Sequence, residues 1–69
     1  MKTLDRPLTD RERAVAAGVA RGKTYAQIAA ALGLNVETVR THAAGLRRLL
    51  GTNKAGIAAW AATNLPGDN

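Results

Sequence analysis

Residues 24–43 of the chain read TYAQIAAALGLNVETVRTHA, and the rest of the sequence is organised around this stretch. Thr24 is followed three residues later by Gln27, a spacing that predicts a capping box at the start of a short helix. Gly33 is placed to end that helix, and Asn35 to cap the next one. The small or apolar positions that two crossing helices need are Ile28, Ala29, Leu32, Leu34 and Val39. Together these features predict a helix-turn-helix.

Length and composition exclude several classes of protein. With 69 residues and only 3% aromatic residues, the chain can form one domain with a thin core and has little room for a catalytic cleft, so we do not expect an enzyme. The sequence has no cysteine and one histidine, which argues against a disulfide framework, a metal site or a bound cofactor. No apolar run approaches the roughly 20 residues of a membrane span. We therefore expect a soluble cytoplasmic protein without a membrane partner.

The charge distribution points to a polyanionic partner. The net charge is +5, and between Arg13 and Gly67 the only acidic residue is Glu37. A field of this kind favours binding to nucleic acid. The alternative is a basic surface that serves only solubility.

Caps and hydrophobic periodicity predict an all-α, four-helix bundle that contains the helix-turn-helix. Thr9 with Glu12 forms a second capping box, and Gly22 and Gly51 are placed to end helices. The expected helices span about residues 10–21, 25–32, 36–50 and 54–63. We assign residues 1–69 to this single domain, with an ordered core at about 8–63 and loose ends outside it.

The helix expected at 36–50 divides into two faces. Its apolar stripe consists of Val39, Ala43, Leu46 and Leu50. On the other face, Arg40 can reach guanine O6 and N7 with both guanidinium nitrogens, and Thr41 can offer a hydroxyl or a methyl group to thymine. Arg47 and Arg48 lie farther along, where a helix leaves the groove and passes phosphates. This face is the candidate for reading DNA.

The start of the helix at 25–32 supplies a second set of candidate contacts. Backbone amides at a helix N-terminus suit a phosphate, so the residues at that end join the candidate set. The candidate DNA-binding residues are Lys23, Thr24, Tyr25, Val36, Glu37, Arg40, Thr41, Ala44, Arg47 and Arg48. Two of them have a simpler alternative role. In that alternative, Thr24 serves solely as an N-cap, and Glu37 serves solely to interact favourably with the helix dipole.

The fourth helix is the candidate dimer interface. Ile57 and Ala61 are suited to face the core, and this would leave Gly56, Ala59, Trp60 and Thr63 on another side. Small residues around one exposed indole are typical of a contact surface. The alternative is that Trp60 packs onto the helices at 10–21 and 36–50.

Four segments together resemble a known family. They are LTDRER (8–13), TYAQIAAALGL (24–34), ETVRTH (37–42) and NKAGIAAWA (53–61), and over about residues 8–63 their order is similar to the LuxR-type four-helix DNA-binding domain of bacterial response regulators. The resemblance implies that Arg40, Thr41 and Ala44 enter the major groove, that Thr24 and Arg40 contact phosphate or base, and that the last helix dimerises. It implies a sequence-specific transcriptional regulator that binds double-stranded DNA as a homodimer and is associated with the nucleoid when bound.

Two other functions are compatible with parts of the pattern. Region 4 of a bacterial sigma factor shares it up to Val39 and binds promoter DNA and RNA polymerase. However, His42 stands where that class usually has arginine, and region 4 does not require the fourth helix. The second alternative is an anti-activator that sequesters a related regulator through the fourth helix. RNA polymerase and such a regulator are therefore candidate protein partners.

Overall fold

The computed structural model describes residues 7–65 of the chain, and the loose ends expected from the sequence lie mostly outside this range. The described part forms four helices: α1 (Asp10–Ala20), α2 (Tyr25–Leu32), α3 (Val36–Leu50) and α4 (Lys54–Asn64). This confirms the predicted all-α architecture. Among residues 7–65, no helix is long and apolar enough to cross a membrane.

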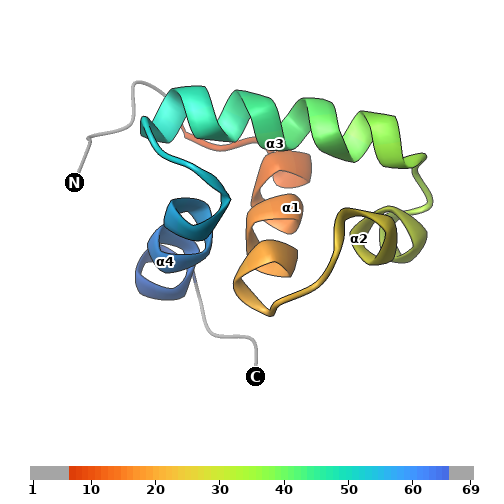
Figure 1. The fold of residues 1–69 in the computed structure, drawn as a ribbon, viewed down its shortest axis with the longest axis horizontal. Coiled ribbons are helices and arrows are strands. Elements are labelled where there is room, and N and C mark those ends of the chain that lie inside the picture. Colours follow the sequence, from red (N-terminus) through yellow and green to blue (C-terminus); the bar gives the residue numbers. More distant parts are fainter. Residues whose placement is uncertain (1–6, 66–69) are drawn as a thin grey trace.

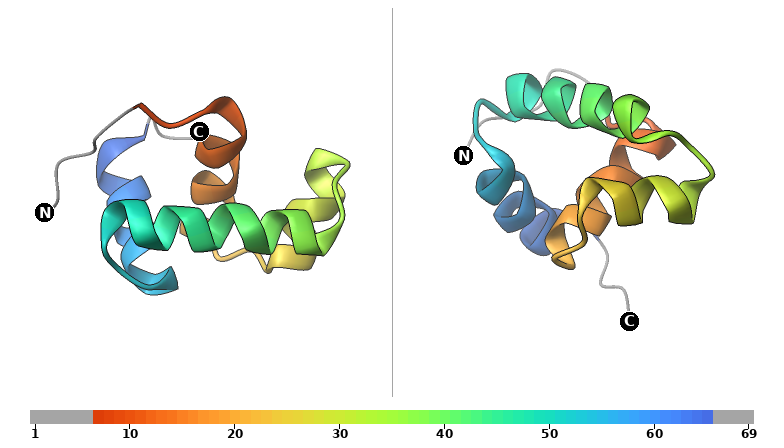
Figure 2. Two further views of the ribbon diagram at one scale, coloured as in Figure 1. Left: turned by 90° about the horizontal axis from the view of Figure 1, so that it is seen from above. Right: turned by 45° about the vertical axis from the view of Figure 1, so that its right-hand side comes forward.

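The longest helix, α3, lies across the other three. In Figure 1, α4, α1 and α2 stand side by side beneath α3, with α1 in the middle. Helix α1 packs against each of the other helices, whereas α2 and α4 lie on opposite sides of it and do not pack against each other. The two further views in Figure 2 show the same arrangement, with one long side of α3 facing away from the bundle.

Each helix begins after a residue whose side-chain oxygen accepts a hydrogen bond from a backbone N–H of the first turn. These N-caps are Thr9, Thr24, Asn35 and Asn53. Both predicted capping boxes are confirmed. In the second, Gln27 N donates to Thr24 Oγ1 at 3.0 Å, and Thr24 N donates to Gln27 Oε1 at 2.8 Å. Local hydrogen bonds therefore set where the helices start.

Three of the helices end at glycines in the left-handed conformation. Gly22, Gly33 and Gly51 have φ angles of 78°, 70° and 67°. The first helix is one residue shorter than predicted, because Arg21 already lies beyond its last turn. Lys23 N donates to Gly18 O at 3.0 Å in a Schellman-type closure around Gly22, and this geometry cannot form while the helix continues.

The core joins α1, α3 and α4 through a few large side chains. Val15, Val39, Leu46 and Ile57 are fully buried. They come from all three helices, and smaller residues such as Ala43 fill the space around them. Burying one such valine, leucine or isoleucine side chain contributes about 1.5–3 kcal/mol. The apolar stripe predicted for α3 is therefore confirmed as the side that holds this helix to the bundle.

Gly18 allows α1 and α2 to approach each other closely. A Cβ atom at this position would lie 2.7 Å from Ile28 Cγ1 and 2.9 Å from Ile28 Cδ1. Glycine inside a helix costs about 1 kcal/mol relative to alanine. The close packing of Ile28 against bare backbone explains why the smallest residue stands here.

We predict that Gly18→Ala lowers the free energy of unfolding by about 1 kcal/mol, because crowding against Ile28 outweighs the better helix propensity of alanine. Gly45→Ala is the matched control, since a Cβ at Gly45 in α3 would have no neighbour within 4 Å. That variant should raise the free energy of unfolding by about 0.5–1 kcal/mol. Urea titrations followed by circular dichroism measure both. Equal stabilisation by the two substitutions would show that the α1–α2 contact is not tight.

Candidate nucleic-acid interface

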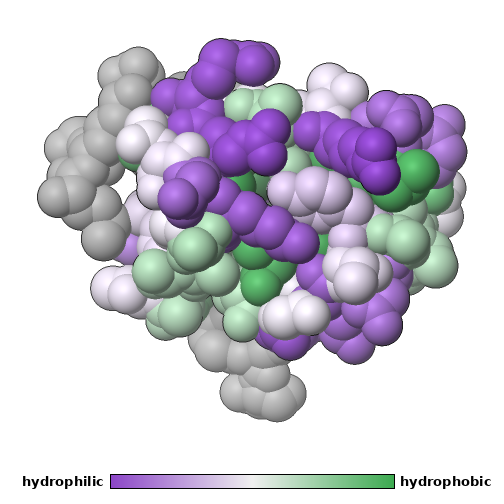
Figure 3. All heavy atoms as spheres, in the orientation of Figure 1, coloured by the Kyte–Doolittle hydropathy of each residue, from purple (hydrophilic) through white to green (hydrophobic). Residues whose placement is uncertain are grey.

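The side of α3 that faces away from the core carries the polar residues of the predicted reading face. Glu37, Arg40, Thr41, Arg47 and Arg48 are exposed. Ala44 and Val36 are half-buried at its edge. Hydrophilic residues gather over α3 in the space-filling view (Figure 3). The structure therefore brings the predicted α3 residues together on one accessible surface.

Arg40 is only loosely held within this face. Its Nη1 lies 3.5 Å from Glu37 Oε2, and the two side chains are 60% and 76% exposed. An exposed ion pair one turn apart on a helix contributes a few tenths of a kcal/mol. The guanidinium can therefore leave Glu37 at little cost when a stronger acceptor is available.

Thr41 and Ala44 define what the middle of the face can offer. Thr41 Oγ1 donates to Glu37 O at 3.0 Å, so its hydroxyl proton is used within the helix while its methyl group and oxygen lone pair stay accessible. Ala44 and the neighbouring Gly45 add no polar group. The centre of the face therefore permits close approach to a partner and offers few hydrogen bonds to it.

The N-terminus of α2 is exposed at Lys23 and Thr24. Capping uses Thr24 Oγ1 as an acceptor for Gln27 N, and the same hydroxyl can still donate a hydrogen bond. Capping by Thr24 is thus confirmed and is compatible with a second contact to an anion.

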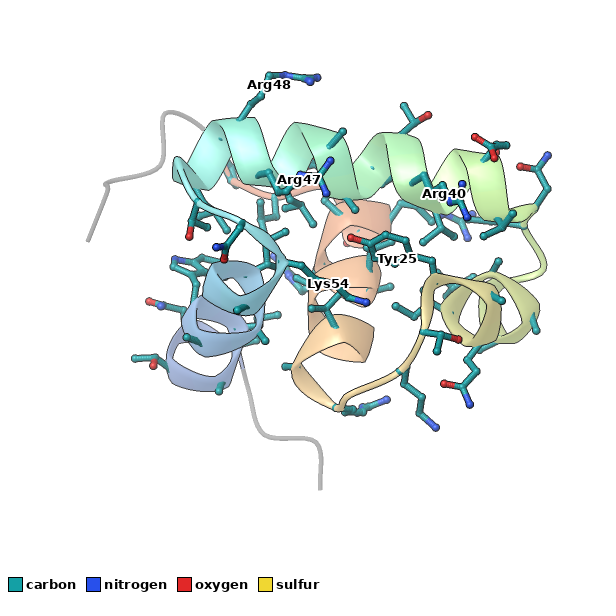
Figure 4. All side chains as sticks on the ribbon, viewed as in Figure 1. Tyr25, Arg40, Arg47, Arg48 and Lys54 are labelled. Carbon is teal, nitrogen blue, oxygen red and sulfur yellow. The ribbon has the colours of Figure 1, made fainter. Side chains whose placement is uncertain are left out.

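Tyr25, one of the candidate DNA-binding residues, does not offer its hydroxyl to a ligand. Its ring is half-buried, and Oη is buried without a hydrogen-bond partner. The ring instead lies beneath Lys54, whose Nζ is 4.4 Å from the ring centroid. Figure 4 shows the two side chains meeting between α2 and α4, on the side of α3 where Arg40 and Arg47 lie.

Lys54 is the residue that the sequence analysis missed. It is the first residue of α4, and its contact with Tyr25 joins two helices that do not otherwise pack. A basic residue at a helix start is unfavourable for the dipole, and this is the one local signal that marked it as unusual. Nothing in the sequence pattern indicates which residue it contacts.

A hollow of about 560 Å³ lies between the end of α3 and the start of α4. It is lined by Ala44, Arg47, Arg48, Gly51, Thr52 and Asn53. Two arginines and two uncharged polar side chains on a concave wall suit an anionic group. The basic residues predicted for the end of α3 therefore border a shallow, open depression.

The expectation of an exposed indole on α4 is wrong. Trp60 is only 9% exposed and belongs to the core, which corresponds to the alternative considered for it. Gly56 also has an internal explanation, because a Cβ there would overlap the side chain of Thr52. Of the predicted interface residues, Ala59 and Thr63 are exposed, and Thr63 Oγ1 donates to Ala59 O at 3.1 Å.

Comparisons with known proteins show which family and which proteins this chain is similar to. The family model described as bacterial regulatory proteins, luxR family, matches residues 6–61. The chain is 49% identical over 47 residues to the transcriptional regulatory protein UhpA of Escherichia coli (strain K12), a match that covers 68% of this chain and 24% of that protein. UhpA of Salmonella typhimurium (strain LT2) matches with the same identity and coverage. The chain thus spans about a quarter of the length of these curated relatives. No solved structure matches it.

Proposed function

The chain belongs to the luxR family of bacterial regulatory proteins, and we propose that it regulates transcription by placing α3 in the major groove of duplex DNA. The observation that carries this proposal is the exposed face of α3, on which Arg40 and Thr41 lie on the first turns and Arg47 and Arg48 on the last. An α-helix fits the width of the major groove, and its first residues reach base edges while later ones pass the backbone. The distribution of side chains along α3 matches this division.

Each residue of the face then has a role set by its position. Arg40 contacts a guanine, Thr41 contacts a base edge with its methyl group or oxygen, and Ala44 allows the helix to sit deep in the groove. Arg47 and Arg48 neutralise backbone phosphates.

Contacts at the start of α2 and α3 flank the groove. Lys23 and the Thr24 hydroxyl contact the backbone at the start of α2. Val36 and Glu37 lie at the start of α3, where Val36 offers an apolar contact and Glu37 an acceptor for a cytosine amino group. The whole of residues 1–69 acts as one DNA-binding domain in this proposal.

A homodimer on DNA is the second part of the proposal. The exposed side of α4 carries Ala55, Ala59, Ala62 and Thr63, small residues that let two helices approach. The contact is small, so DNA must reinforce it by binding both copies at once. RNA polymerase and related regulators are candidate protein partners of the bound dimer, which would act in the cytoplasm at the nucleoid.

The proposed function is tested by the salt dependence of binding to duplex DNA. If about four to six phosphates are neutralised, the logarithm of affinity should fall against the logarithm of salt concentration with a slope of roughly −4 to −5. Fluorescence anisotropy with a random duplex measures this slope. Negligible binding at low salt would refute DNA binding and would favour a module that sequesters another regulator.

The roles of two arginines on α3 should differ. We predict that Arg40→Ala weakens binding to the preferred site by about 1–3 kcal/mol and relaxes the preference at one base pair, whereas Arg48→Ala weakens all sequences about equally. Selection of bound sequences from a random duplex library, repeated with each variant, measures both effects. The assignment is reversed if the preferred sequence changes with Arg48→Ala and not with Arg40→Ala.

The dimer is tested at Ala59, because Trp60→Ala would remove core packing worth about 3–5 kcal/mol and would confuse unfolding with loss of the interface. Ala59→Glu places two like charges near the two-fold axis, so we predict that cooperative filling of two half-sites is lost while one half-site is still bound. Ala20→Glu adds the same charge at an exposed position of α1 and is the control. Band-shift titrations on one- and two-site duplexes are the measurement. Unchanged cooperativity in Ala59→Glu would exclude this side of α4.

A further inference from the structure

The contact between Lys54 and Tyr25 connects two helices that do not otherwise pack against each other. Lys54 begins α4 and Tyr25 begins α2, and these helices lie on opposite sides of α1. The Lys54 side chain reaches from α4 so that Nζ stands 4.4 Å from the centroid of the Tyr25 ring. In Figure 4 this meeting point lies beside α3, on the side from which Arg40 and Arg47 project. The ammonium group therefore lies next to the proposed DNA-binding face.

The stability of α4 does not explain this position of a positive charge. The first turn of α4 contains no acidic residue, and the helix dipole disfavours a lysine there. Within residues 7–65, Lys54 has no acidic partner. Its ammonium group instead contacts the face of the Tyr25 ring. A cation is attracted to such a ring face, and this attraction orients the side chain.

The ammonium group keeps hydrogen-bonding capacity in this geometry. A lysine carries three N–H donors, and contact with a ring face occupies only one side of the group. Lys54 is exposed to solvent, and the hollow lined by Arg47 and Asn53 opens immediately beside the start of α4. An anionic group seated there would meet Arg47 and Arg48 of α3, and Asn53 on the same wall directly precedes Lys54.

We propose that Lys54 contacts a backbone phosphate of the DNA read by α3, and that Tyr25 is the positioning residue that holds it there. This inference rests on the proposed function and adds a contact from α4 to those from α2 and α3. Lys23 and Thr24 at the start of α2 and Lys54 at the start of α4, all beneath α3, would then fix how α3 enters the groove. Tyr25 acts through its ring, since its hydroxyl is buried.

Lys54→Met tests the phosphate contact, because methionine keeps the length and helix propensity of the side chain and removes the charge. The salt slope of this variant should be smaller in magnitude than that of the unmodified protein by about 0.9, the contribution of one phosphate. Its affinity deficit should therefore shrink about 3.5-fold between 50 and 200 mM salt. Arg13→Met removes one charge from an exposed position of α1 and should change the slope much less.

Tyr25 variants test the positioning role. Tyr25→Leu removes the ring and should weaken DNA binding roughly two- to fivefold, while Tyr25→Phe keeps the ring and should restore binding. If Tyr25 acts through Lys54, Tyr25→Leu should have no further effect in the Lys54→Met background. Circular dichroism and thermal unfolding of each variant confirm that it remains folded.

The outcomes separate this inference from the function on which it rests. If the unmodified protein shows a steep salt slope and Lys54→Met has the same slope, DNA binding stands and the Lys54 contact is refuted. If Tyr25→Leu weakens binding equally with and without Lys54, the positioning role is refuted. A flat slope in the unmodified protein overturns the proposed function itself.

Discussion

The packing of Val15, Val39, Leu46 and Ile57 is the interaction on which the rest of the structure depends. These side chains are fully buried and join α1, α3 and α4. Much of the remaining core is alanine, which buries little area, so each large side chain contributes an unusual share of the stability. Because the apolar stripe of α3 is used in this packing, its opposite side is left to polar and small residues. The core and the accessible face thus both follow from the division of α3 into a buried apolar side and an exposed side.

Helix starts and ends could be predicted from the sequence because local chemistry determines them. Thr24 with Gln27, and Gly33 after Leu32, act through hydrogen bonds and backbone conformations within a few residues of each other. The faces of α3 could also be predicted, since large apolar residues alternate there with arginines. The environment of Trp60 could not, because alanines surround it in α4 and leave no contrast to show which side is buried.

Contacts between distant residues explain the features that the sequence left open. Gly18 appears unfavourable in a helix until Ile28 is seen against it, and Gly56 has no evident role until Thr52 is seen beside it. The pairing of Lys54 with Tyr25 is of the same kind. Each depends on the arrangement of whole helices, which short-range periodicity does not specify. The candidate α3 residues were therefore predictable, and the contact between Lys54 and Tyr25 was not.

The composition of the reading face bears on how specificity arises. Ala44 and Gly45 occupy the middle of α3 without polar side chains, so in the proposed complex direct readout by one copy would depend on Arg40, Thr41 and Glu37. Three side chains can distinguish only a few base pairs, whereas the phosphate contacts proposed for Lys23, Arg47 and Arg48 would form with any sequence. One copy would thus bind DNA with appreciable affinity and little selectivity. In the proposed dimer, two copies joined through α4 would square the discrimination of one, which is a physical reason for such a sparse face to act in pairs.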